Sequence, residues 1–108
     1  MKKIHRRRRT LIMTRFMVTD VVIPTAGREA GRLYYVVGLD GEYLLLANGK
    51  DRTLDQPKRK SRRHVQKVLR SETRVAEKLR NGDKVLNSEL RRDLAYIGQK
   101  MQSNNLGG

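Results

Sequence analysis

The chain has 108 residues and a formal net charge of +14, from 25 basic and 11 acidic side chains. That length suits one domain, or one domain with tails, and so strong a positive charge indicates a polyanionic partner. The chain contains no cysteine, which excludes a disulfide, a thiolate metal site and a thiol nucleophile. With only two histidines, His5 and His64, we expect no metal and no cofactor.

The first 16 residues form a basic tail with seven cations and no acidic residue. Because like charges repel and little of this segment can be buried, we expect residues 1–16 to be disordered alone. The tail cations with a candidate role in RNA binding are Arg6, Arg7, Arg8 and Arg9. In an alternative interpretation the tail is not native, since Met13 and Met17 each suit a start site.

Residues 17–68 have the pattern of a small β domain. Five short strands are predicted, at residues 18–23, 33–39, 42–47 and 50–54 and in a last segment after Pro57 that ends near Val68. Asp40-Gly41 and Asn48-Gly49 are two-residue hairpin signals between strands. Short strands joined by tight turns predict a mainly β fold, a small barrel of SH3-like or OB-like size.

Residues 69–108 are predicted to form a helical segment that covers the barrel. The strands at 33–39 and 42–47 are apolar on both faces, so one face fills the barrel and the other needs a cover. A helix is predicted over 72–80, capped by Ser71 and ended by Asn81-Gly82, and a second over 89–101, capped by Asn87 or Ser88. The apolar stripe of the second helix is Leu90, Leu94, Ile97 and Met101, and a frayed end follows.

The first candidate site is the turn before the second predicted strand. Residues 26–32 read Ala-Gly-Arg-Glu-Ala-Gly-Arg between two apolar runs. Glycine reaches backbone angles that strain other residues, and cations at the rim of a barrel suit a polyanion. The turn therefore predicts a constrained, RNA-binding edge at Gly27, Arg28, Gly31 and Arg32, and the alternative is a solvated hairpin without a binding role.

The second candidate site is the basic segment at residues 58–63, which has five cations in six positions. On a strand, alternation would place Arg59, Ser61 and Arg63 on one face and the other three side chains on the opposite face. Cations of this density predict phosphate contacts and a salt-dependent affinity, and the alternative is a solvated loop. The candidate RNA-binding residues here are Lys58, Arg59, Lys60, Arg62, Arg63 and His64.

A strand, a glycine-arginine turn and a second strand together resemble the KOW motif of several ribosomal proteins and of a class of bacterial transcription elongation factors. The chain is similar to the small bacterial KOW-domain RNA-binding proteins, and through them to a large-subunit ribosomal protein family of archaea and eukaryotes. The resemblance covers residues 17–70, with a looser match in the helices. It rests on residues 26–28, 31–39 and 58–63. It departs at Asp20-Val21-Val22, where those relatives often have a glycine near the start of the strand.

The resemblance implies an SH3-like (KOW) barrel of five strands with two C-terminal helices. It also implies a non-catalytic protein that binds structured RNA, with ribosomal RNA as the expected target. Because no apolar stretch approaches the length of a membrane span and no signal-peptide pattern is present, we expect a cytoplasmic protein. We expect a monomer when free, contacts with the ribosome and its proteins, and no membrane or small-molecule substrate. Alternative hypotheses are a transcription-linked or architectural nucleic-acid-binding protein and a KOW protein-interaction module.

Two further function classes find little support in the residues. No nucleophile–base set and no P-loop sequence is present, so we expect no enzyme. Readers of single strands need exposed aromatic side chains among the cations, and this chain has only five aromatic residues. Three of them lie in predicted strands, where packing is the expected role, which favours structured RNA recognised through its shape and phosphates.

Overall fold

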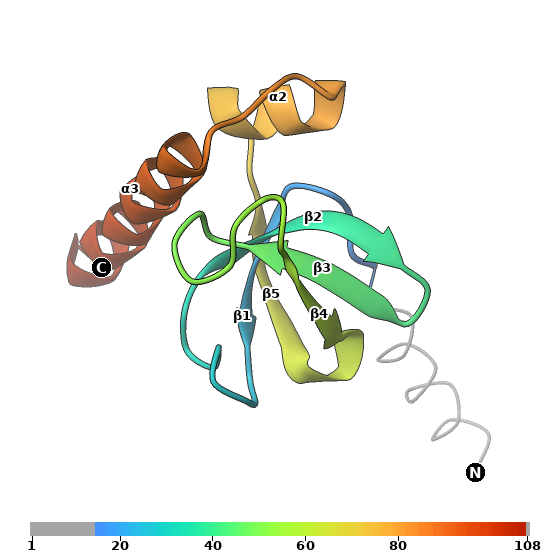
Figure 1. The fold of residues 1–108 in the computed structure, drawn as a ribbon. Helices are drawn as coiled ribbons and strands as arrows, with labels where there is room; N and C mark the ends of the chain where they lie inside the picture. The colour runs from blue at the N-terminus through green and yellow to red at the C-terminus, as the bar shows by residue number, and fades with distance from the viewer. Residues whose placement is uncertain (1–14, 108) are drawn as a thin grey trace, which may run out of the picture.

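Five strands form one antiparallel sheet in the order β4-β3-β2-β1-β5, and two helices follow it in the chain (Figure 1). The computed structural model describes residues 15–107, so the predicted tail at Arg6–Arg9 lies outside the described residues. The elements are β1 (Asp20–Pro24), β2 (Tyr34–Asp40), β3 (Tyr43–Ala47), β4 (Lys58–Ser61), the 3-10 helix η1 (Arg62–His64), β5 (Val65–Arg70), α2 (Arg74–Asn81) and α3 (Asn87–Gly107). None of the described helices has both the length and the apolar character needed to cross a membrane.

The predicted hairpin at Asp40-Gly41 is confirmed, with β2 and β3 paired from Tyr35↔Ala47 to Asp40↔Tyr43. β1 begins two residues later than predicted, because Thr19 has a φ of 77° and interrupts the extended backbone. A positive φ is rare for a β-branched residue. Three backbone hydrogen bonds to Thr19 and its neighbour, including Thr19 N to Val36 O at 2.8 Å, hold this turn between strands.

The predicted strand at residues 50–54 is wrong, because this segment is a loop that docks on α3. Its backbone N–H groups bond to side chains: Asn48 Oδ1 accepts from Lys50 at 3.0 Å and from Arg52 at 3.1 Å. Leu54 N donates to Asn87 Oδ1 at 2.8 Å. The loop approaches α3 so closely at Gly49 that a Cβ there would lie 2.2 Å from the carbonyl oxygen of Asn87. Glycine at this position permits the contact.

The predicted last strand is also corrected, since it is two strands separated by η1. Ser61 ends β4 and caps η1, where its Oγ accepts from the backbone N of Arg63 at 3.3 Å. The backbone N of Arg62 still donates to the carbonyl of Glu42 at 3.1 Å, in register with the β3–β4 pairing, and the chain then turns into η1. The alternation of side chains between the two faces of a strand therefore ends at Ser61. The predicted placement of Arg63 on the same face as Arg59 no longer follows from it.

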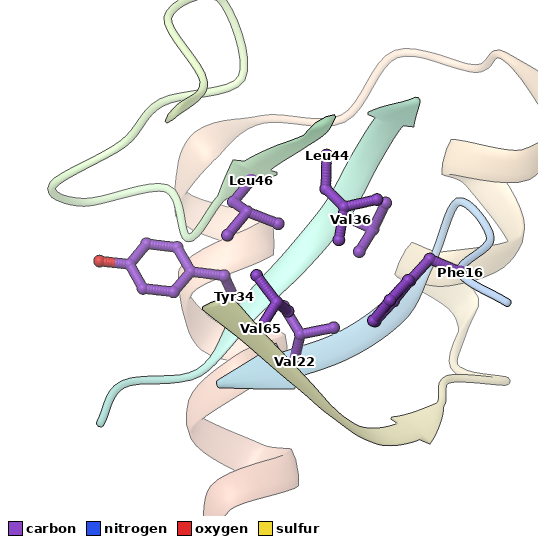
Figure 2. Packing of buried hydrophobic residues seen from close by; sticks show 7 residues of the cluster. All are labelled: Phe16, Val22, Tyr34, Val36, Leu44, Leu46 and Val65. Atoms are coloured by element: carbon purple, nitrogen blue, oxygen red, sulfur yellow. The ribbon is translucent and has the colours of Figure 1, made fainter. Parts of the chain in front are cut away.

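One face of the sheet carries an apolar cluster of seven buried residues (Figure 2). They come from the segment before β1 and from four strands, with Tyr34 and Phe16 at opposite ends of the view. The cluster contains Phe16, Val22, Tyr34, Val36, Leu44, Leu46 and Val65.

The opposite face is covered by the two helices, as the two-sided apolar pattern predicted. Leu90, Leu94 and Ile97 of α3 and Ala76 of α2 pack with Val21, Tyr35 and Ala47 of the sheet. Side chains that alternate along β1, β2 and β3 thus enter two separate clusters. The predicted role of the α3 stripe as a cover for the sheet is confirmed.

The helix ends differ from the prediction in three places. One is the start of α3: the helix begins at Asn87, so the predicted caps Asn87 and Ser88 both lie inside it. Thr73, and not Ser71, caps α2, because its Oγ1 accepts from the backbone N of Ala76 at 3.2 Å. The predicted end of α2 at Asn81-Gly82 is confirmed, with Gly82 in the left-handed conformation. α3 continues past the predicted end at residue 101 to Gly107, since no glycine or proline occurs between residues 99 and 106.

A buried hydrogen-bonded group joins the sheet to both helices. The hydroxyl of Tyr35 donates to Asp93 Oδ2 at 2.5 Å and lies 2.7 Å from Ser71 Oγ. Thr73 Oγ1 donates to the same carboxylate oxygen at 2.8 Å. Burial, together with the hydrogen bond to Asp93, raises the pKa of Tyr35 to about 12. These hydrogen bonds fix the positions of α2 and α3 on the sheet face that they cover.

The neighbouring tyrosines of β2 predict opposite effects of the same substitution. Tyr34 is fully buried, and within the described residues its hydroxyl has no hydrogen-bond partner. Tyr34→Phe should therefore be neutral or stabilising by up to about 1 kcal/mol, whereas Tyr35→Phe should destabilise by about 1–3 kcal/mol because Asp93 loses a buried donor. Urea unfolding of the two variants measures this difference, and equal effects would contradict the assignment of the two hydroxyls.

Candidate nucleic-acid interface

The turn at residues 27–32, here called the glycine turn, is constrained by its backbone. Gly27 and Gly31 both have a φ of 83°, a conformation that favours glycine, as the sequence predicted. Gly31 N donates to the carbonyl of Pro24 at 3.0 Å, and Ala30 N donates to Gly27 at 3.2 Å. These hydrogen bonds fold the turn back onto the end of β1.

The structure brings the glycine turn against the basic segment, 30 residues away in the chain. Thr25 N donates to the carbonyl of His64 at 2.8 Å, and Lys60 Nζ lies 3.3 Å from Glu29 Oε1. In Figure 1 the turn after β1 and the η1 connection lie at the same end of the sheet. The two sites that the sequence predicted separately therefore form one surface.

Glu29 is the acidic residue on which this surface is built. Its side chain is only 6% exposed, and its two oxygens contact Arg52 Nη2 at 2.9 Å and Lys60 Nζ at 3.3 Å. The hydrogen bond from Arg52, and more weakly the one from Lys60, lower the pKa of Glu29 to about 2. One carboxylate thus ties the glycine turn, the loop after β3 and β4 together.

Sequence reasoning missed Glu29 and Arg52 as members of the site. Glu29 stands inside the glycine turn, and an acidic residue among arginines was a local signal for an internal ion pair. Arg52 had no such signal, because it lies 23 residues away in a segment predicted as a strand. Their pairing follows from the docked loop, which no short-range pattern predicts.

The predicted cations divide into engaged and open groups. Arg32 pairs with Asp51, Arg59 pairs with Asp40 at 3.0 Å, and Lys60 is only 11% exposed in its pair with Glu29. Among the described residues, those predicted for the site that form no ion pair are Lys58, Arg28, Arg62, Arg63 and His64. Arg28 and Arg63 are exposed and lie on the two halves of the surface. They are the strongest candidates for contact with an anion.

An open groove of about 1130 Å³ runs along η1. The described residues that line it are Phe16, Glu42, Tyr43, Ser61, Arg62, Arg63, His64, Val65, Gln66 and Lys67. Arg62 and Lys67 flank the ring of Phe16, each 5.9 Å from its centroid. Lys67 was not among the residues predicted for the site. Its ammonium group forms an ion pair with the buried Asp20 at 3.3 Å. The groove extends the basic surface toward the β2–β3 hairpin.

Charge and shape are the properties of this surface that the structure defines. Within residues 15–107, no cluster of three or more histidine or acidic side chains is placed to hold a metal ion. No model of a protein family matches the chain, and no curated protein matches it either. The function of this surface is therefore argued from its own residues.

The lowered pKa of Glu29 predicts how stability depends on pH. A carboxyl whose pKa is about 2 in the folded protein and near its usual 4.5 in the unfolded chain contributes stability that is present above 4.5 and lost as the pH falls through 2. Glu29→Gln should therefore reduce the loss of unfolding free energy between about pH 7 and about pH 3. Urea titrations at both pH values measure it.

Glu42→Gln is the matched control, because Glu42 is exposed and makes no ion pair among the described residues. It should keep the pH dependence of the parent protein. If Glu29→Gln does the same, Glu29 does not hold the surface together through its charge.

Proposed function

We propose that the protein binds structured RNA without catalysis, through phosphate contacts made by the glycine turn and the basic segment, and that this RNA is ribosomal. The observation that carries the proposal is the junction of the two basic features around Glu29. This junction supports a shared role for Arg28 and Arg63, which are both exposed and form no ion pair among the described residues. Cations carried by two backbone segments that contact each other suit the phosphates of a folded RNA.

The sheet order supports the resemblance to SH3-like KOW barrels. β4 and β5 are the two ends of the order β4-β3-β2-β1-β5, and η1 connects them, which is the connection expected of an SH3-like barrel. The glycine turn joins β1 to β2, where the KOW resemblance puts it. Thr19 lies directly before β1 and has a φ of 77°, an angle that glycine adopts without strain. KOW relatives often have a glycine near this position. The fold thus gives the proposal a second line of support.

Salt-titrated binding to a structured RNA tests the phosphate contacts. Arg28→Gln and Arg63→Gln should each weaken binding and reduce the slope of log affinity against log salt by roughly 0.9, the value per phosphate for duplex DNA. Arg32→Gln should have a smaller effect, because Asp51 already neutralises that guanidinium. Lys100→Gln on α3 is the control and should leave the slope unchanged.

An unchanged slope for both Arg28→Gln and Arg63→Gln would place the RNA surface elsewhere on the protein. Duplex DNA of the same sequence serves as the competitor at physiological salt. Equal competition by DNA would favour the transcription-linked or architectural alternative over an RNA-specific protein, because A-form RNA and B-form DNA differ in groove shape and in the 2′-hydroxyl.

Association with ribosomes is tested by sedimentation of the tagged protein through a sucrose gradient. We expect the full chain to migrate with a ribosomal subunit or the whole ribosome and to return to the top of the gradient after ribonuclease treatment. The Arg28→Gln, Arg63→Gln double variant should shift to the top without ribonuclease. A full chain that stays at the top in both conditions would contradict the ribosomal part of the proposal.

A further inference from the structure

The helices leave one end of the outer sheet face open. They cover Tyr35 and Ala47, whereas the β2–β3 hairpin extends away from α3 (Figure 1). The pairings Asp40↔Tyr43 and Leu45↔Arg59 place these residues on the same face at the open end. Tyr43 is 37% exposed. The sequence predicts that tyrosines in strands pack in the core. Tyr43 does lie in a strand, but its side chain is accessible.

The guanidinium of Arg59 lies over this exposed ring. Its guanidinium carbon is 3.9 Å from the centroid of Tyr43, and its Nε donates to Asp40 Oδ2 at 3.0 Å. The ring supports one face of the guanidinium and the carboxylate holds one edge, so the plane is oriented before any ligand arrives. The Arg59 side chain remains 57% exposed, which leaves room for a planar group on its other face.

The chemistry of this stack suits a nucleobase better than a phosphate. Asp40 neutralises Arg59 and would repel a second anion in contact with it. A nucleobase is planar and uncharged, and it stacks on guanidinium planes as well as on aromatic rings. Tyr43 and Ser61 also line the groove that contains Arg62 and Arg63, so a base on the stack has cations for its flanking phosphates close by.

We propose that Arg59 and Tyr43 form a stacking platform for one unpaired base, displaced from a structured RNA as a bulge or loop nucleotide. The inference rests on the proposed function and assigns Arg59 a different role from the phosphate contact that its sequence suggests. It also gives Tyr43 a binding role. A single platform reads one base beside a folded region, which agrees with the small number of aromatic residues in the chain.

Three versions of one short RNA hairpin test the platform. The first has a single bulged adenosine, the second has an abasic nucleotide at the bulge, and the third has no bulge. The first two have the same backbone and number of phosphates, so they differ only in the base. We expect the protein to bind the adenosine bulge about tenfold more tightly than the abasic bulge, a typical effect of stacking one base.

Substitutions with matched controls assign the preference to the platform. Arg59→Lys keeps the charge but removes the planar group, so it should abolish the preference for the base and leave the salt slope unchanged. Tyr43→Leu should also abolish the preference, and Tyr43→Phe should keep it. Tyr96→Leu is the control, because Tyr96 is an exposed tyrosine on α3 with a cation, Lys100, 5.6 Å from its ring.

The outcomes separate this inference from the proposed function. Salt-dependent binding of all three hairpins with equal affinity for the adenosine and abasic bulges overturns the platform and leaves the RNA-binding proposal standing. A base preference that persists in both Arg59→Lys and Tyr43→Leu places the stacking site elsewhere and also overturns it. Absence of salt-dependent binding to any hairpin overturns both proposals. Melting temperatures equal to that of the parent show that the variants are folded.

Discussion

Both faces of the sheet are apolar, and the arrangement of the whole molecule follows from the need to bury each of them. Neighbouring residues such as Val21 and Val22, or Tyr34 and Tyr35, belong to different clusters. Side chains from four strands and from the segment before β1 bury one face against one another, and α2 and α3 bury the other. Because burial of apolar area is the main favourable contribution to folding, neither the sheet nor the helices would be stable with one of these faces left in water.

Polar contacts decide the position of the helices on the sheet, since apolar burial alone has little directional preference. The Tyr35 hydroxyl and the Asp93 carboxylate join β2 to α3 at 2.5 Å. The loop after β3 meets the start of α3 through Gly49 and through the hydrogen bond from Leu54 to Asn87. The same loop carries Arg52 to Glu29, so the packing of the helices and the geometry of the basic surface are mechanically connected.

The basic surface depends on an acidic residue. A net charge of +14 on a small domain creates repulsion, and Glu29 offsets it where Arg52 and Lys60 come together. Surface ion pairs such as Arg59 with Asp40 contribute little to stability. Their effect is to fix the orientation of a side chain that would otherwise sample many rotamers. In this protein, acidic side chains determine which of the described cations are engaged in ion pairs, as Lys60 is with the buried Glu29 and Arg59 is with the exposed Asp40.

Much of the architecture follows from local patterns: the mainly β domain, the hairpin at Asp40-Gly41, the two helices and the positive φ of Gly27 and Gly31. These features depend on turn residues and on side-chain periodicity, which act over a few residues. The loop at residues 50–54, the division of the basic segment by η1, and the contacts of Glu29 and Arg59 were decided by the tertiary structure. Each of them depends on hydrogen bonds, ion pairs or stacking between segments 16 to 33 residues apart in the chain. These segments come into contact only because the fold buries both apolar faces of the sheet.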